Sequence, residues 1–423
     1  MVGIDPKNKK YTVTFKPKAE RLNQRDDKFE LFRHAVGLAD VRDILDLSRY
    51  VGPTHMHDEI RKTEFTVTDI NSYESPFIIA RLTPDQANRL RKDPNVLWVV
   101  EDYNMYAHVE GVTWQWPEVH TQEAQRSPLS AFGAGVNVCV LDTGVDNTHV
   151  DLRDRVKVTQ NFTSDNLGGK GGSDHGTHVA GIIAATQGNN EGTAGVAPMC
   201  NIWNLRCGDA QGIFAASDTI EAQEYARANG AILWNQSFGG APFDTTQQAR
   251  YQFLYDDGRL IINSAGNTGK QELVYPAAYG GVISISSLQG QPGEVIISDF
   301  STWNNQIDLT APGSDISSCG YNNTIVTKSG TSMACPCVTG VAALGLGAYR
   351  TNACGPPYTP GARQNQIMEA VLRDSATKTS TEGTLVGSQP RGTKDIFYGW
   401  GIPLADVVVA ALKGVSVNSL VAR

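Results

Sequence analysis

Three polar residues stand at the ends of apolar segments, and their side chains are those of a carboxylate, a base and a nucleophile. Asp142 follows the apolar run "VNVCVL", His175 opens "HGTHVAGIIAA", and Ser332 opens a run of small residues in "GTSMACP". A serine hydroxyl is a weak nucleophile until an imidazole takes its proton, and the imidazole needs a carboxylate to fix its tautomer. Asp, His, Ser is one known order of such a triad. These residues predict nucleophilic catalysis by a serine.

Neighbouring residues add to this prediction or compete with it. Asn267, in "SAGNTG", follows a predicted strand and offers an oxyanion donor beside the backbone N–H of Ser332. Cys335 and Cys337 also carry nucleophilic side chains and lie three and five positions past Ser332. On a helix that begins near Ser332 we expect both thiols in the core, where apolar burial raises the thiol pKa. Burial therefore disfavours the two thiols, but the residues alone leave Ser332, Cys335 and Cys337 as candidate nucleophiles of this segment.

Each residue also has a simpler interpretation when it is taken alone. Asp142 at a strand end is typical of a turn residue, and Ser332 is typical of a helix N-cap. His175 and His178 are spaced as metal ligands, but neither a third ligand nor an H-E-x-x-H pattern accompanies them, so we predict a structural role for His178. The simpler interpretations would have to coincide in four separate segments. The catalytic interpretation is therefore preferred.

The elements that position these residues read as an α/β fold. Helix-like segments separate several strands that are apolar throughout; one of these, residues 217–230, has Ser217 or Asp218 as a candidate cap and Gly230 as its stop. Such strands predict a parallel sheet that is buried on both faces, with function at the carboxyl ends of the strands. The predicted strands are 136–141, 231–237, 259–265, 281–286 and 307–311, with a further one between Cys200 and Cys207.

The first hundred residues have a different pattern of strand-like and helix-like segments, which predicts a smaller α+β domain. The pattern is β-α-β-β-α-β, with strands at 11–16, 64–70, 76–82 and 95–103 and a helix that Thr83 caps before Pro84. Residues 1–108 carry 17 basic and 17 acidic residues, so the remainder carries the whole net charge of −8. An acidic domain without a basic cluster excludes nucleic acid as a predicted partner.

The apolar runs, the N-terminus and the cysteines indicate where in or outside the cell the protein is expected to work. No apolar run reaches the roughly 18–20 residues of a membrane span, so no membrane partner is expected. The N-terminus lacks the apolar segment of a secretory signal, which favours an intracellular or virion-associated protein unless such a signal has been removed. The seven scattered cysteines predict buried thiols, with Cys319–Cys354 as the one pairing left open.

Four motifs carry a family resemblance. "LDTGVD", "HGTHVAG", "SAGN" and "GTSMACP", in this order, resemble the signatures of the subtilisin-like serine proteases, and "YGWGIPLADVVVAAL" resembles their closing helix. The resemblance spans roughly residues 110–415 and implies a subtilisin-like α/β fold with a doubly wound, mainly parallel sheet. It also implies a catalytic domain at 109–423 that hydrolyses peptide bonds in proteins or peptides through an acyl-enzyme. The implied roles are nucleophile for Ser332, general base for His175, orienting carboxylate for Asp142 and oxyanion donor for Asn267. Cys337 stands where the family usually has histidine, which we interpret as a packing variation.

The N-terminal unit, residues 1–108, is similar to the propeptide inhibitor of that family, a ferredoxin-like α+β domain. The resemblance implies a zymogen whose own propeptide is an intramolecular inhibitor and folding aid. It also implies self-processing near residues 106–111, between Tyr106 and Val112. The alternative is a catalytically silent, or only self-cleaving, assembly or binding component that retains this domain; its long stretch at 17–60 keeps that alternative open.

The resemblance also implies substrate and metal residues. Val274 stands where many relatives have glycine, so we expect a raised pocket floor and a preference for modest P1 side chains. Calcium is the implied structural ion, with Asp151 and, from the loop 186–195, Asn189 as ligands. The implied substrate-binding residues are Ser237, Phe238 and Gly239 on one strand, Gly212 on the opposite edge strand, and Ala265, Gly266 and Val274 around the S1 pocket.

Overall fold

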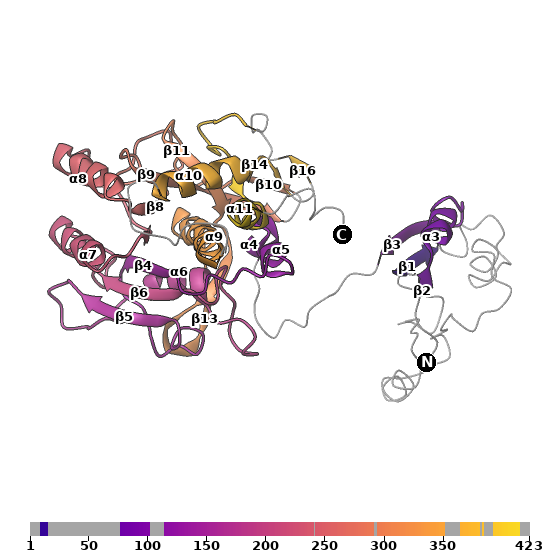
Figure 1. Ribbon diagram of the computed structural model, residues 1–423, viewed down its shortest axis with the longest axis horizontal. Coiled ribbons are helices and arrows are strands. Elements are labelled where there is room, and N and C mark those ends of the chain that lie inside the picture. The colour runs from indigo at the N-terminus through magenta and orange to yellow at the C-terminus, as the bar shows by residue number, and fades with distance from the viewer. Residues whose placement is uncertain are drawn as a thin grey trace. The chain divides into compact units, whose positions relative to one another are not determined.

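The structure is a computed structural model, and it divides into two compact units, residues 1–106 and 107–423, each described by itself (Figure 1). The described residues are 9–15, 77–101, 114–240, 242–291, 294–351, 364–380, 383–384 and 392–414. The predicted strand at 64–70, the stretch at 17–60 and the predicted processing region at 106–111 lie outside these ranges.

The described residues of the first unit form a three-stranded antiparallel sheet and one helix. Strand β1 (Lys9–Phe15) lies between β2 (Phe77–Leu82) and β3 (Val96–Glu101), and α3 (Pro84–Arg91) connects the outer two. Thr83 caps α3 as predicted: its hydroxyl accepts from the backbone of Gln86 at 3.2 Å, and the Gln86 side chain accepts from the Thr83 backbone at 2.8 Å. Because the predicted strand at 64–70 lies outside the described residues, the ferredoxin-like assignment stays a prediction.

The second unit is built on a sheet of eight strands in the order β10-β9-β8-β7-β4-β6-β5, with β11 also paired to β9. All of these pairs are parallel except β10 with β9, so the predicted mainly parallel sheet is confirmed. The strands are β4 (Asn137–Asp142), β5 (Val156–Asn161), β6 (Asn201–Arg206), β7 (Leu233–Gln236), β8 (Leu260–Ser264), β9 (Val282–Gln291), β10 (Glu294–Ile297) and β11 (Ile307–Pro312).

Apolar side chains cover both faces of this sheet, as the unbroken apolar strands require. Along β4, Val138 and Val140 join one core cluster, whereas Cys139 and Leu141 join the other. The first cluster includes residues of α6 (His175–Ala184), α9 (Thr331–Thr351), α10 (Gln364–Ser375) and α11 (Ala405–Lys413); the second includes residues of α7 (Ala216–Ala228) and α8 (Thr245–Asp256). The remaining named elements are α4 (Gln115–Glu118), α5 (Thr121–Gln125), η3 (Tyr321–Asn323), β12 (Ile316–Cys319), β13 (Ile325–Lys328), β14 (Ala376–Thr377), β15 (Thr379–Ser380), β16 (Gly383–Thr384) and β17 (Ile402–Pro403).

Two predictions about helices need correction. Helix α7 takes Ala215 as its N-cap without a side-chain hydrogen bond, because the Ser217 hydroxyl donates to the adjacent Asp218 carboxylate at 3.0 Å instead. Gly230, with φ of 74°, does follow the end of that helix as predicted. Thr331–Tyr349 of α9 is long and apolar enough to cross a membrane by length and composition, contrary to the expectation that no segment is. It is 94% buried within the unit, which is typical of a core helix.

Candidate active site

Three chain segments meet at the carboxyl ends of the central parallel strands. Asp142 is the last residue of β4, His175 is the first residue of α6, and Ser332 lies in the first turn of α9. The Nδ1 atom of His175 lies 2.7 Å from Oδ1 of Asp142. The Asp142 side chain is 1% exposed, whereas that of His175 is 26% exposed. A buried carboxylate therefore orients an imidazole that faces solvent.

Small residues allow helix α6 to approach the end of β4 this closely. A Cβ atom on Gly176 would lie 2.4 Å from the carbonyl oxygen of Gly144 and 3.1 Å from Oδ1 of Asp142, so a side chain there would displace the carboxylate. Thr143 joins the two segments: its backbone N–H donates to Asp142 at 2.7 Å, and its hydroxyl accepts from the Gly176 N–H at 3.1 Å. Hydrogen bonds of Thr143 therefore connect the end of β4 to the start of α6.

The electrostatics of this pair favour the protonated imidazole. Burial by itself lowers the pKa of His175, but the charge of Asp142 and the hydrogen bond to it outweigh that effect and raise the pKa. Among the described residues no group donates to Oδ2 of Asp142, although this oxygen is buried. The hydrogen bonds of this carboxylate are therefore made through Oδ1, with the imidazole and with the Thr143 N–H.

Ser332 is held against the segment that follows β7. Its Oγ donates to the backbone oxygen of Ser237 at 3.1 Å, and the Ser237 hydroxyl donates to the backbone oxygen of Ser332 at the same distance. Within the described ranges, Ser332 Oγ makes no hydrogen bond to His175. Catalytic hydrogen bonds often form only when substrate binds, so this contact does not exclude a serine nucleophile.

Hydrogen bonds from Thr331, the residue before Ser332, hold the Asn267 side chain in place. Its Oδ1 accepts from the backbone N–H of Thr331 at 2.8 Å and from the Thr331 hydroxyl at 2.9 Å. This leaves the Nδ2 group of the exposed Asn267 for another acceptor, close to Gly330. The N–H of Ser332, in the first turn of α9, has no intrahelical acceptor by its position. The two N–H groups lie near the same point, because a Cβ built on Gly330 would be 3.4 Å from Nδ2 of Asn267 and 3.6 Å from the Ser332 nitrogen.

Comparison with known proteins places this geometry in a family. Residues 133–401 match the model of the Subtilase family. The chain belongs to this family. It is 33% identical over 322 residues to a thermostable alkaline protease of Halalkalibacterium halodurans, covering 76% of this chain and 84% of that protein. It is 35% identical over 254 residues to thermitase of Thermoactinomyces vulgaris, and this match covers 60% of this chain and 85% of thermitase.

Comparison with solved structures finds the same family as comparison with related sequences. The crystal structure of a cold adapted subtilisin-like serine proteinase has a TM-score of 0.56 and 26% identity to this subtilase, and covers 69% of this chain and 99% of that one. The predicted subtilisin-like α/β fold is therefore confirmed. This subtilase is a subtilisin-like serine endopeptidase, and its substrates are proteins or peptides.

The predicted S1 residues lie together around Val274. A Cβ on Gly239 would lie 3.1 Å from a methyl group of Val274, and a Cβ on Gly266 would lie 3.1 Å from the other methyl group. Val274 is buried between these two glycines, and Ala265 is buried beside them. The valine side chain therefore occupies space that a glycine would leave empty.

Neither predicted substrate-binding strand is present: β7 ends at Gln236, before Ser237, Phe238 and Gly239, and Gly212 does not lie on a strand either. The segment turns back on itself: the Gly212 N–H donates to the Asp209 oxygen at 3.1 Å, with φ of 76° at the glycine. The Asp209 carboxylate stabilises the turn by accepting from the N–H of Ile213 at 2.8 Å. Beyond the turn, the ring of Phe214 stacks on Phe238 with centroids 4.3 Å apart, so the turn contacts the predicted substrate segment.

The predicted calcium ligands contact each other directly. Nδ2 of Asn189 donates to Oδ1 of the buried Asp151 at 2.7 Å, and the Thr193 N–H donates to Oδ2 at 2.9 Å. The loop curls around this carboxylate with left-handed backbone at Asn190 and Gly192. Asp151 thus faces the loop as a ligand would. Asn189 presents its amide nitrogen to that carboxylate, so its oxygen becomes a ligand only if the amide turns over.

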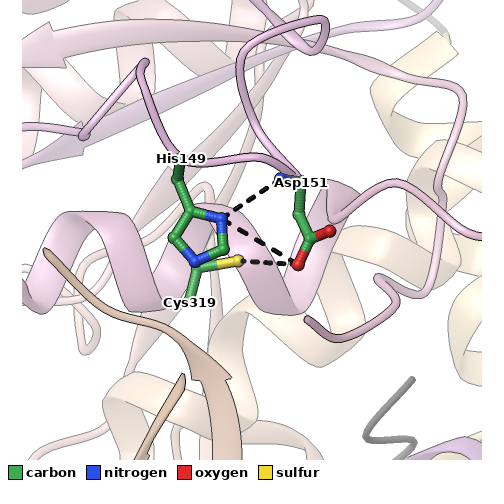
Figure 2. Close-up of side chains that lie close together, drawn as sticks. All are labelled: His149, Asp151 and Cys319. Carbon is green, nitrogen blue, oxygen red and sulfur yellow. Dashed lines mark hydrogen bonds and ion pairs between the residues drawn. The ribbon is translucent and has the colours of Figure 1, made fainter. Parts of the chain in front are cut away.

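Behind this loop, His149, Asp151 and Cys319 form a buried cluster, shown in Figure 2. The Asp151 N–H donates to Nδ1 of His149 at 3.1 Å, and the Cys319 thiol donates to Oδ2 of Asp151 at 3.8 Å. Nε2 of His149 lies 3.1 Å from the backbone oxygen of Thr324 and must donate to it. Since hydrogen bonds already occupy both imidazole nitrogens, we interpret the cluster as a structural connection between loops.

His178 and the two cysteines near Ser332 behave as predicted. Nε2 of His178 lies 3.0 Å from the Ile316 oxygen and 3.1 Å from the Val326 oxygen, and burial lowers its pKa to about 4, so it is a neutral structural residue. Cys335 and Cys337 are fully buried, and burial raises the pKa of each thiol. All six described cysteines are free, including Cys319; Cys354 lies outside the described residues.

Sequence reasoning missed Arg206, a buried cation that supports the site. Its Nε donates to the Thr143 oxygen at 3.1 Å, one of its terminal nitrogens donates to the Gly168 oxygen at 2.9 Å, and the guanidinium pairs with Asp165. It therefore ties the loop before His175 to the loop after Asp142. The available signal was a single charged residue at the end of the apolar strand "NIWNLR".

Proposed function

We propose that Ser332, His175 and Asp142 are the nucleophile, the general base and the orienting carboxylate of this endopeptidase. The observation that carries the proposal is the 2.7 Å contact between the buried Asp142 and the solvent-facing His175, at the strand ends where α9 presents Ser332. Asn267 takes the role of oxyanion donor, because its anchoring through Oδ1 leaves Nδ2 for the substrate.

The reaction follows from these positions. Ser332 Oγ attacks the scissile carbonyl carbon while His175 Nε2 accepts its proton, and Asp142 stabilises the imidazolium through Nδ1. The carbonyl oxygen becomes an oxyanion that accepts from Asn267 Nδ2 and the Ser332 N–H. The imidazolium then protonates the departing amine, which leaves an acyl-enzyme. Water, deprotonated by His175, releases the second product and restores the serine.

Val274 supports a preference for modest P1 side chains. Its methyl groups lie against the backbone at Gly239 and Gly266, where a deep pocket for an aromatic ring needs empty space. Val274→Gly is expected to raise kcat/KM for Phe at P1 relative to Ala by about 10- to 100-fold. The test compares matched peptides that differ only at P1. Faster cleavage after Phe or Tyr than after Ala by the wild-type enzyme would refute the preference.

We further propose that the first unit is a ferredoxin-like inhibitory propeptide and that the enzyme cuts itself between Tyr106 and Val112. The division of the chain between residues 106 and 107 and the antiparallel sheet covered by α3 support this proposal. Intact mass and N-terminal sequencing of purified protein test it. A mature N-terminus outside that interval, or a cut that persists in Ser332→Ala, would contradict it.

Subtilases generally bind structural calcium, and we propose that Asp151 and the loop 186–195 hold such an ion here. A buried carboxylate and a loop curled around it suit a cation that takes 6–8 oxygen ligands, with backbone carbonyls of the loop making up the number. Asn189 contributes its oxygen once its amide is turned. Chelation is expected to lower the melting temperature of the Ser332→Ala protein, and calcium to restore it. An unchanged melting temperature would count against the site.

The decisive experiment for the catalytic assignment is labelling with a serine-reactive fluorophosphonate. Wild-type protein is expected to gain the mass of one adduct, located on the peptide that contains Ser332, while Ser332→Ala gains none. The alternative is a silent or only self-cleaving component that retains its first unit. Self-cleavage without turnover of added peptides would favour that alternative, and folded protein without any adduct would refute the assignment.

A further inference from the structure

An ion pair joins the two segments that carry the proposed base and nucleophile. Asp174 immediately precedes His175, and Lys328 lies four residues before Ser332 at the end of β13. The Lys328 Nζ atom lies 2.8 Å from Oδ1 of Asp174, and the two side chains are 32% and 28% exposed. The family signatures do not include either residue, and the proposed mechanism does not use them.

This ion pair bears on the distance between the imidazole and the hydroxyl. Ser332 Oγ is hydrogen-bonded to Ser237 and not to His175 among the described contacts, so nothing in the triad itself ties α6 to α9. The carboxylate of Asp174 makes no capping hydrogen bond at the start of α6. Its contact with Lys328 therefore connects the residue beside the base to the strand that leads into the nucleophile.

The same two residues place opposite charges beside the imidazole. The groups that act on His175 are Asp142 from β4, Asp174 from the start of α6 and Lys328 from β13, with His178 one turn along α6. Asp142 and Asp174 raise the pKa of His175, and Lys328 lowers it. Asp142 keeps the direct hydrogen bond, while the charges of Asp174 and Lys328 oppose each other.

We propose that Asp174 and Lys328 are positioning residues whose ion pair holds His175 next to Ser332 and balances the charge around the imidazole. The inference rests on the proposed role of His175 as the base. It assigns a function to a pair of surface residues outside the triad. Loss of either partner leaves the other charge unbalanced beside the imidazole, so the two losses have opposite effects on its protonation.

The test measures the titration of the imidazoles by NMR in the full chain carrying Ser332→Ala, which cannot digest itself. Lys328→Met is expected to raise the pKa of His175 by about half a pH unit, and Asp174→Asn to lower it by about the same amount. The double variant is expected to return close to the parent. Because this readout needs no turnover, it remains valid if the catalytic assignment fails.

Matched variants separate this effect from general damage. Lys328→Arg keeps the charge and should leave the titration unchanged, and Arg227→Met removes a cation from another partly exposed pair, with Glu224 on α7, and should also leave it unchanged. In the active enzyme, the acid limb of kcat/KM should move in the same directions as the titration. Shifts of the same sign in the two single variants, or no shift in either, would overturn the proposal.

Discussion

Two aspartate–histidine pairs of the second unit, Asp142–His175 and Asp151–His149, are built in opposite ways. In the Asp142–His175 pair the imidazole Nδ1 donates to the carboxylate, and the His175 side chain is 26% exposed. In the Asp151–His149 pair Nδ1 accepts from the aspartate backbone N–H, and the His149 side chain is 1% exposed (Figure 2). The residue types are the same, but Nδ1 lies 2.7 Å from the carboxylate in the first pair and 3.9 Å from it in the second, so the orientation of the ring differs, as does the access of solvent.

This difference separates a site that can transfer protons from one that cannot. In the proposed mechanism, Nε2 of His175 accepts the proton of the nucleophile, and the Asp142 carboxylate stabilises the charge that the imidazole gains. His149 donates through Nε2 to the backbone oxygen of Thr324, so it has no nitrogen left for chemistry. The Asp151 carboxylate is instead used by Asn189, Thr193 and Cys319 to connect loops. One pair is expected to control rate and the other stability.

The sharpest test of this contrast is the same substitution in both pairs. Asp142→Asn is expected to lower kcat by about 10⁴-fold with the fold retained, because the imidazole loses its tautomer and its counter-charge. Asp151→Asn is expected to lower the free energy of unfolding by about 2–4 kcal/mol, because the amide places a donor against the donors of Asn189 and Thr193. Peptide hydrolysis and urea unfolding measure the two effects.

Unfolding is best followed in the Ser332→Ala background, where self-digestion is absent. The contrast breaks if Asp142→Asn leaves kcat within tenfold of wild type, or if folded Asp151→Asn loses activity to the same extent as Asp142→Asn.

Asn267, near Ser332, and Asn189, which donates to Asp151, allow the same comparison of rate with stability, with smaller expected effects. Asn267→Ala is expected to reduce kcat by about 10²–10³-fold with little change in KM, because the Nδ2 donor acts on the oxyanion of the transition state. Asn189→Ala is its matched control: it removes a hydrogen bond to Asp151 and is expected to alter melting temperature while kcat stays near wild type. A large rise in KM with unchanged kcat in Asn267→Ala would assign that residue to substrate binding instead.

The Cys319 thiol, which donates to Asp151 of the Asp151–His149 pair, is expected to have no effect on the rate of peptide hydrolysis. Cys319→Ala removes a donor to Asp151 from a fully buried position, and we expect a loss of about 1–2 kcal/mol in the free energy of unfolding. Steady-state peptide hydrolysis of the folded variant is expected to match wild type. A selective fall in kcat with unchanged stability would show that the two pairs are coupled.

The smallest expected effect is a displaced pH profile. Because Asp142 raises the pKa of His175 above its ordinary value of 6.5, kcat/KM should rise through a midpoint above 6.5 as the base loses its proton. The sign for stability is opposite: a raised folded-state pKa stabilises the fold below pH 6.5, and that contribution is lost as the pH rises through the folded-state pKa. A midpoint at or below 6.5 would contradict this.

Several elements could be predicted from local chemistry. Unbroken apolar runs predicted the parallel strands, because a strand buried on both faces has no polar side. Thr83 before Pro84 predicted the start of α3, since capping uses residues adjacent in the chain. The Ser217 or Asp218 cap was wrong because these two side chains bond each other. The Gly212 strand was wrong because the Asp209 carboxylate stabilises a turn there.

Within the candidate site, the sequence by itself determined which residues could do chemistry: the residue types of Asp142, His175, Ser332 and Asn267 and the motifs around them. Only the tertiary structure decided how aspartate and histidine meet, because ring orientation and burial depend on contacts far apart in the chain. The same cause explains why Arg206 and the Asp174–Lys328 pair escaped prediction. Arg206 joins loops on either side of β5, and the lysine and aspartate lie more than a hundred residues apart. Long-range charge pairs leave no periodic trace in a sequence, whereas burial of strands and helices does.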